Sequence, residues 1–186
     1  MDAATYRFDS TAEVELTRLL GLPRVKTPKI KLAGPTTIER AHSVSPAPGK
    51  FQAKTTIKEL NLSGKVLGVK VSVSLNRDHK SEGAIEGRAD PNSVDPNKPE
   101  PIGRLKSYFH VYVSVTTPFG VLYNKEPVEM RATIDSIPPS RAKYKQYSPP
   151  RDLFDKIFRT IAAQMQCAAH NVKLVKDVPA RPGPQG

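Results

Sequence analysis

The sequence predicts a mainly β protein of the α+β class, either an antiparallel β-sandwich or a curved sheet of about six or seven strands, with a long C-terminal amphipathic helix. Two observations predict this class. Apolar and polar residues alternate in four separate segments, which is typical of antiparallel strands with one buried face. Near the C-terminus, apolar residues recur at spacings of three and four, which is typical of a helix. The alternative is a helix-grip-like sheet wrapped on that helix, because each element needs a partner to cover its apolar face.

The N-terminal segment permits two interpretations. Ser10 and Glu13 stand at the spacing of a capping box, which predicts a short helix over residues 11–20. The aromatic and aliphatic residues between Thr5 and Leu16 instead indicate a strand. The sequence leaves both interpretations open.

The middle of the chain supplies the strands. Each alternating segment places its apolar residues on one side and its Lys, Ser, Thr or Glu residues on the other, and turn-forming residues separate the segments. Two shorter strands are expected at 83–89 and 120–123. The four alternating segments are FQAKTTIKEL (51–60), VLGVKVSVSL (66–75), RLKSYFHVYVSV (104–115) and PVEMRATID (127–135).

The C-terminal third is predicted to be helical. Ser148 stands where a helix N-cap is expected, with prolines in the first turn and Asp152 near the helix start. A helix over about 150–172 then places one apolar stripe along its length. The stripe consists of Leu153, Phe154, Ile157, Phe158, Ile161, Met165, Ala168 and Val172.

Composition favours one β-rich domain over residues 1–178. Residues 90–103 are expected to form a long Pro/Asn loop, and 179–186 a disordered tail. The single Cys167 gives no internal disulfide, no secretory signal is visible, and no apolar run is long enough to span a bilayer. These observations predict a soluble, intracellular protein.

No catalytic or metal-binding pattern is apparent, so the interpretation leans away from an enzyme and predicts no cofactor and no metal site. Cys167 and His170 are three residues apart, but no orienting group or oxyanion hole accompanies them, and a buried cysteine usually behaves as a small hydrophobe. The remaining histidines are scattered singly along the chain.

The net charge of +11 favours contact with a polyanion such as nucleic acid. Alternating tyrosines and cations on a solvated sheet face offer rings for base stacking, although the same residues also make an ordinary sheet surface. The sequence therefore predicts a non-catalytic, basic interaction or structural protein, with protein partners or self-assembly as further options. The candidate binding residues are Lys106, Tyr108, His110, Tyr112, Arg141, Lys143, Tyr144, Lys145 and Tyr147.

A second functional class uses the other side of the sheet. An apolar cavity between the sheet and the C-terminal helix would bind a lipid or another hydrophobic small molecule. The small residues Ala162, Ala163, Cys167 and Ala168 would leave room for one, although they equally permit close packing.

Overall fold

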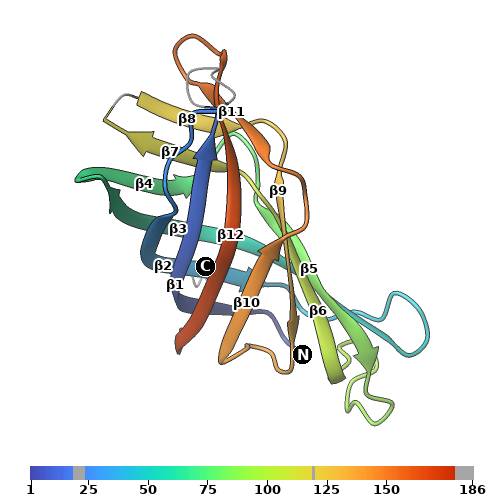
Figure 1. Cartoon of the computed structure of the whole chain (residues 1–186). Helices are drawn as coiled ribbons and strands as arrows, with labels where there is room; N and C mark the ends of the chain where they lie inside the picture. The colour runs from blue at the N-terminus through green and yellow to red at the C-terminus, as the bar shows by residue number, and fades with distance from the viewer. Residues whose placement is uncertain (19–23, 119, 179–186) are drawn as a thin grey trace, which may run out of the picture.

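The computed structural model describes residues 1–18, 24–118 and 120–178, and it is all β in this part of the chain. Every strand pairing is antiparallel, and the order of the strands is shown in Figure 1. No helix in the described residues is long and apolar enough to cross a membrane. The twelve strands of the described part are β1 (Ala4–Thr17), β2 (Ile30–Arg40), β3 (Lys50–Val66), β4 (Val69–Leu75), β5 (Glu82–Ala89), β6 (Pro101–Val111), β7 (Val113–Thr117), β8 (Gly120–Asn124), β9 (Val128–Ile134), β10 (Arg141–Gln146), β11 (Arg151–Asp155) and β12 (Ile161–Val178).

The strands form one sheet that closes on itself. The first strand, β1, pairs with β2 on one side and with β12 on the other, and β3 pairs with both β4 and β5. Within the described residues every strand therefore has a hydrogen-bonded neighbour on each side, and the sheet has no edge. Closure satisfies the backbone groups that an edge strand would leave unpaired.

Four of the eight paths around the closed sheet consist of two strands in succession. These paths are β4 with β5, β6 with β7, β8 with β9, and β10 with β11, whereas β1, β2, β3 and β12 run through without interruption. The chain changes direction between the two strands of an interrupted path, as Figure 1 shows for β4 and β5. Both of these strands lie beside the continuous strand β3, which pairs through Asn61–Val66 with β4 and through Lys50–Thr56 with β5.

Polar side chains replace the missing backbone partners at these bends. Asn124 is fully buried, accepts a hydrogen bond from the backbone N–H of Val113, and donates to the carbonyls of Val111 and Glu126. The hydroxyl of Ser81 accepts a hydrogen bond from the backbone N–H of Tyr112. Backbone bonds such as that from the Asn76 N–H to the Tyr112 carbonyl complete the bends, so side chains and backbone together satisfy them.

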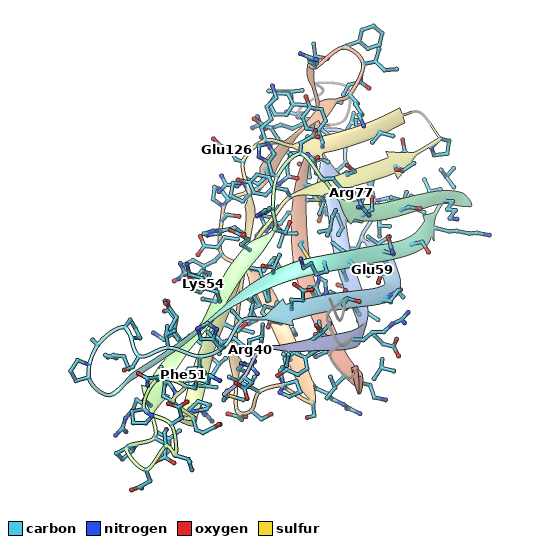
Figure 2. The ribbon with its side chains drawn as sticks, turned by 180° about the vertical axis from the view of Figure 1, so that it is seen from behind. Arg40, Phe51, Lys54, Glu59, Arg77 and Glu126 are labelled. Atoms are coloured by element: carbon cyan, nitrogen blue, oxygen red, sulfur yellow. The ribbon has the colours of Figure 1, made fainter. Side chains whose placement is uncertain are left out.

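The core lies inside the closed sheet because the inward residues of each strand are apolar. One large cluster runs from Tyr6 and Phe8 to Met165 and Val172, and a smaller one surrounds Phe51. Charged residues cover the outside, and Figure 2 shows Lys54 and Arg77 among these outer side chains. All four alternating segments contain strands, and in each of them the apolar side is mostly the buried one.

The predicted fold class is wrong in two respects. Neither a sandwich nor a helix-grip arrangement is present, since twelve strands in the described residues form a single sheet. The predicted helix over 150–172 is instead the hairpin of β11 and β12. Of the two interpretations of the N-terminal segment, the strand is confirmed as β1. The predicted tail 179–186 lies outside the described residues.

Pairing on both sides explains why β12 is not a helix. It pairs with β1 on one side and with β10 and β11 on the other, so its backbone hydrogen bonds are made across the sheet. The exposed Ile157 and Phe158, which the helical pattern counted as core, lie between the two strands and outside the core. Tertiary pairing outweighs the helix propensity of this alanine-rich segment.

Candidate ligand-binding cavity

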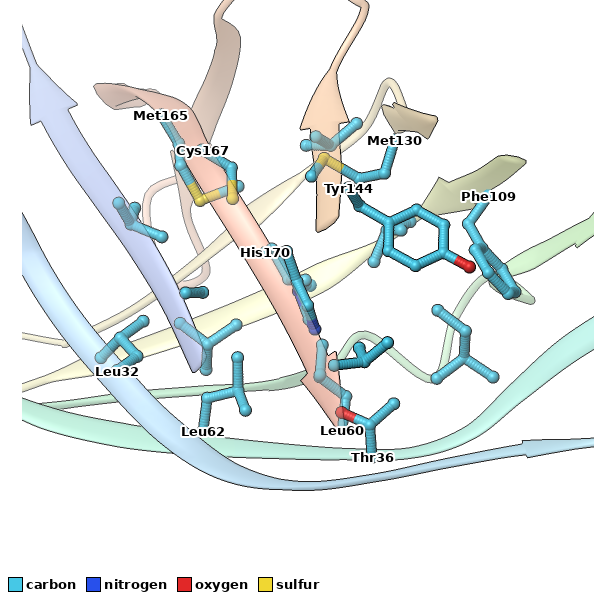
Figure 3. A pocket seen from close by; sticks show the side chains of 18 of the residues that line it. Leu32, Thr36, Leu60, Leu62, Phe109, Met130, Tyr144, Met165, Cys167 and His170 are labelled. Carbon is cyan, nitrogen blue, oxygen red and sulfur yellow. The ribbon is translucent and has the colours of Figure 1, made fainter. Parts of the chain in front are cut away.

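An apolar cavity of about 80 Å³ lies inside the closed sheet. Residues of β1, β2, β3, β4, β6, β7, β9, β10 and β12 surround it, and Figure 3 shows most of their side chains. No Asp, Glu, Lys or Arg is among the described residues that line it. The lining is Ala12, Val14, Leu32, Thr36, Ile38, Ile57, Leu60, Leu62, Val73, Phe109, Val111, Val113, Val128, Met130, Tyr144, Met165, Cys167, His170 and Val172.

One irregularity in β12 places a histidine in this cavity. Cys167 pairs with Val14 of β1 and Ala169 with Glu13, so Ala168 is an extra residue without a partner on β1. Such a bulge reverses the alternation of side chains beyond it. Inward residues are therefore odd-numbered up to Cys167, and His170 and Val172 face inward after it.

His170 has no hydrogen-bond partner for its imidazole among the described residues. Its neighbours across the sheet are Ala12 on β1 and Tyr144 on β10, and Figure 3 shows the ring pointing into the space bordered by Leu60 and Thr36. Burial lowers the pKa of His170 to about 4. The imidazole is therefore neutral near pH 7, with one donor and one acceptor nitrogen.

The hydroxyl groups that face the cavity already have protein partners. The Ser10 hydroxyl donates to that of Thr36 at 2.8 Å, and the hydroxyls of Tyr144 and Ser107 are 2.9 Å apart. Among the polar side chains that line the cavity, His170 is thus the one without a hydrogen-bond partner in the described residues.

Cys167 does not form a reactive pair with His170. Burial raises the pKa of the thiol to about 12, and burial also keeps the imidazole uncharged. A catalytic cysteine needs the opposite shifts, namely a lowered thiol pKa beside a protonated histidine. In the described residues no group of three metal-ligating side chains occurs either.

The predicted Lys/Tyr face is divided between the two sides of the sheet. Lys106, Tyr108 and His110 lie on the outer side of β6, whereas Tyr144 is buried inside and lines the cavity. Tyr112 stands between β6 and β7, with its ring stacked on that of His79 at 4.6 Å. Tyr144 therefore does not share a surface with the other candidates.

Acidic residues interrupt the outer face near Tyr108. Partial burial, and after it the nearby Glu86 carboxylate, raises the pKa of Tyr108. His110 stands between Glu82 and Glu129 on the neighbouring strands. The guanidinium of Arg131 forms an ion pair with Glu129 and lies 3.8 Å from the ring centre of Tyr147.

The remaining predicted residues form a separate cationic strip. Arg141, Lys143 and Lys145 are exposed on the outer side of β10. Arg141 stands directly opposite Lys173 of β12, and Lys145 stands opposite Arg131 of β9. Arg141, Lys143, Lys145 and Lys173 have no ion pair within the described residues.

Sequence reasoning placed Cys167 at a cavity but missed His170, because it treated the C-terminal segment as a helix. On a helix His170 would lie beside the apolar stripe, whereas the bulge at Ala168 directs it inward. The alternation of Ala163, Met165 and Cys167 indicates a strand. After the extra residue Ala168 the inward positions become even-numbered, so the alternation no longer continues in the sequence.

No protein-family model matches the sequence, and no curated protein matches it significantly. The fold is similar to the solved structure of DynF from the dynemicin biosynthesis pathway of Micromonospora chersina, with a TM-score of 0.74. The match covers 93% of this chain and 81% of DynF at 18% sequence identity. An identity this low supports a shared fold and nothing more specific.

Proposed function

We propose that this protein binds a small hydrophobic molecule inside its closed sheet. The observation that carries the proposal is the apolar cavity with a single unpartnered polar group, His170. Cavities of this composition are typical of sites for small apolar ligands. The predicted cavity between a sheet and a helix is thereby replaced by one bounded by strands, with β12 in the place of the helix.

The size of the cavity limits the ligand. Its volume of about 80 Å³ exceeds the roughly 10–15 Å³ needed for one water but falls below the ~150 Å³ of an engineered cavity that binds benzene. Even a single-ring ligand must therefore displace side chains. Met130 and Met165 line the cavity, and methionine adapts its shape readily because it is unbranched and flexible.

NMR titration with toluene, an uncharged single-ring probe, tests the proposal. Ala12→Leu fills space beside His170, so we expect it to weaken binding at least about tenfold, equivalent to roughly 1.4 kcal/mol. Ala33→Leu is the matched control, because Ala33 is exposed on β2 and does not line the cavity. Equal affinity in both variants, or no binding by the wild type, would contradict the proposal.

Polyanion binding is a second candidate, and the cationic strip of Arg141, Lys143, Lys145 and Lys173 favours it. Arg141 and Lys173 stand directly opposite each other, and like charges so placed destabilise a sheet. Asp9 of β1 stands on the other side of Lys173 and offsets part of this positive charge. A bound phosphate chain would offset the rest.

Fluorescence anisotropy of a labelled single-stranded oligonucleotide, titrated at several salt concentrations, tests this second function. Arg141→Gln with Lys143→Gln should weaken binding and flatten its salt dependence. Tyr108→Ala with Tyr112→Ala reports whether rings on the outer face also contribute. Binding unaffected by either pair of changes would assign it to diffuse charge.

A further inference from the structure

The polar groups of the cavity differ in what they offer a ligand. Thr36 and Tyr144 are hydrogen-bonded to Ser10 and Ser107, and the Cys167 thiol lies 3.5 Å from the carbonyl oxygen of Ala169. The His170 imidazole has no such partner among the described residues. A polar group without a hydrogen-bond partner costs free energy in apolar surroundings. A ligand that hydrogen-bonds to His170 therefore gains from that bond as well as from its apolar contacts.

The geometry around His170 provides space for such a group. Its neighbour on β1 is Ala12, whose side chain is a single methyl group. Figure 3 shows the ring directed into the cavity rather than along the wall. A hydroxyl or carbonyl oxygen of a ligand can therefore approach a ring nitrogen from inside the cavity.

The cavity offers no counter-ion for a charged ligand. Arg40, a buried cation, does not line the cavity but an adjoining space of about 20 Å³, which shares Ile38, Phe109, Tyr144 and Val172 with it. Its guanidinium is already bonded to the Tyr6 hydroxyl and to the carbonyls of Asp2 and Ala41. A carboxylate or ammonium group would lose its hydration inside the sheet without gaining an ion pair.

Resting on the proposed function, we infer that the ligand is an uncharged apolar molecule with one hydroxyl or carbonyl group, which hydrogen-bonds to His170. The hydrocarbon part occupies the apolar lining, and the single polar atom fixes its orientation. This assigns His170 as the residue that determines specificity.

Three probes with the same ring test this inference: toluene, benzyl alcohol and benzoate, titrated at pH 7.5 and followed by NMR. In the wild type, benzyl alcohol should bind more tightly than toluene, and benzoate should leave the signals of cavity residues unchanged. In His170→Phe the hydroxyl of benzyl alcohol loses its hydrogen-bond partner but must still lose its hydration on binding. Toluene should therefore bind this variant more tightly than benzyl alcohol. We expect the ratio of the two affinities to change at least about tenfold, the value of one good hydrogen bond.

Two further variants and one NMR signal test the role of His170 directly. His170→Gln retains a donor and an acceptor and should restore part of the preference for the alcohol. His110→Phe, on the exposed outer side of β6, is the matched control and should bind like the wild type. In the wild type itself, benzyl alcohol and not toluene should shift the imidazole ¹⁵N signals of His170.

The outcomes separate the inference from the proposed function. Binding of toluene and benzyl alcohol with the same ratio in wild type and His170→Phe overturns the role of His170 and leaves the cavity as a binding site. Tightest binding by benzoate overturns the uncharged class. Failure of all three probes to bind overturns the proposed function, and the inference with it.

Discussion

His170 reaches the interior because of its neighbour Ala168, the extra residue of the β12 bulge. With regular alternation, Ala169 and Asn171 would face inward and the imidazole would face solvent. The bulge instead places a neutral histidine among apolar side chains, where burial lowers its pKa to about 4. That shift has a measurable consequence for stability.

We expect the free energy of unfolding to fall as the pH falls from 6.5 towards 4. The unfolded chain binds a proton at His170 near pH 6.5, whereas the folded protein does so only near pH 4. The stability that the neutral imidazole contributes is thus complete above pH 6.5, and about 2 kcal/mol of it is lost by pH 5.0. Urea denaturation at pH 7.5 and 5.0 measures this difference.

Other groups also titrate in this range, so variants isolate the contribution of His170. The loss between the two pH values should be about 2 kcal/mol smaller in His170→Phe than in the wild type. His110→Phe, an exposed position, should show the loss of the wild type. An equal loss in all three proteins would show that His170 titrates alike in the folded and unfolded states.

The thiol of Cys167 should be inert in the folded protein. Burial raises its pKa to about 12, so almost no thiolate exists at pH 8. We expect its reaction with 5,5′-dithiobis(2-nitrobenzoate) to be at least about 100-fold slower in buffer than in 6 M urea. Reaction at the denatured rate in buffer would contradict the burial of this side chain.

Prediction from the sequence succeeds at the residue scale where alternation is regular. The inward positions of β6 and β7, from Leu105 to Val115, follow from the period of two. Tyr144 and His170 do not, because their orientation depends on where a strand begins or where a bulge lies. No local signal in Arg141–Gln146 distinguishes the buried Tyr144 from the exposed Tyr147.

At the scale of the element, Asn124 holds one bend of the sheet. It is fully buried at the end of β8, and its side-chain amide bonds to three backbone groups of the β6–β7 and β8–β9 bends. An aspartate or a threonine lacks the combination of one acceptor and two donors that this position uses. The bend therefore depends on this side chain.

Asn124→Ala should destabilise the protein by about 3 kcal/mol, because the Val113 N–H and two carbonyls lose their partner inside the sheet. Thermal or urea denaturation measures the change. Asn61→Ala is the matched control, since Asn61 is exposed and its amide bonds only to the side chain of Glu59. A cost below about 1 kcal/mol for Asn124→Ala would mean that water replaces the lost bonds.

The elements that were predicted correctly are those whose pattern is uninterrupted. The alternation in 51–60 and 127–135 is regular enough to identify strands without tertiary information. In β12 the bulge turns a spacing of two, from Met165 to Cys167, into a spacing of three, from Cys167 to His170. A strand with a bulge and many alanines thereby acquires the periodicity of an amphipathic helix.

At the scale of the whole molecule, closure decides where the interior lies. A sandwich and a closed sheet present the same alternation along each strand, so the sequence does not distinguish between them. What distinguishes them is the pairing of β1 with β12, which are separated by most of the chain. That pairing has no local sequence signal, and it is what encloses the cavity.

Amide hydrogen exchange, followed by NMR, tests the closure. In a closed sheet both sides of β1 are paired from Thr5 to Val14, so consecutive amides over this range should all be protected. If β1 were an edge strand, every second amide would point to solvent and exchange fast. The interior residues of β3 provide the reference, because β3 has partners on both sides whether or not the seam closes. Alternating fast exchange along β1 and β12 together would show that the seam is open, and an open seam would leave no enclosed cavity for a ligand.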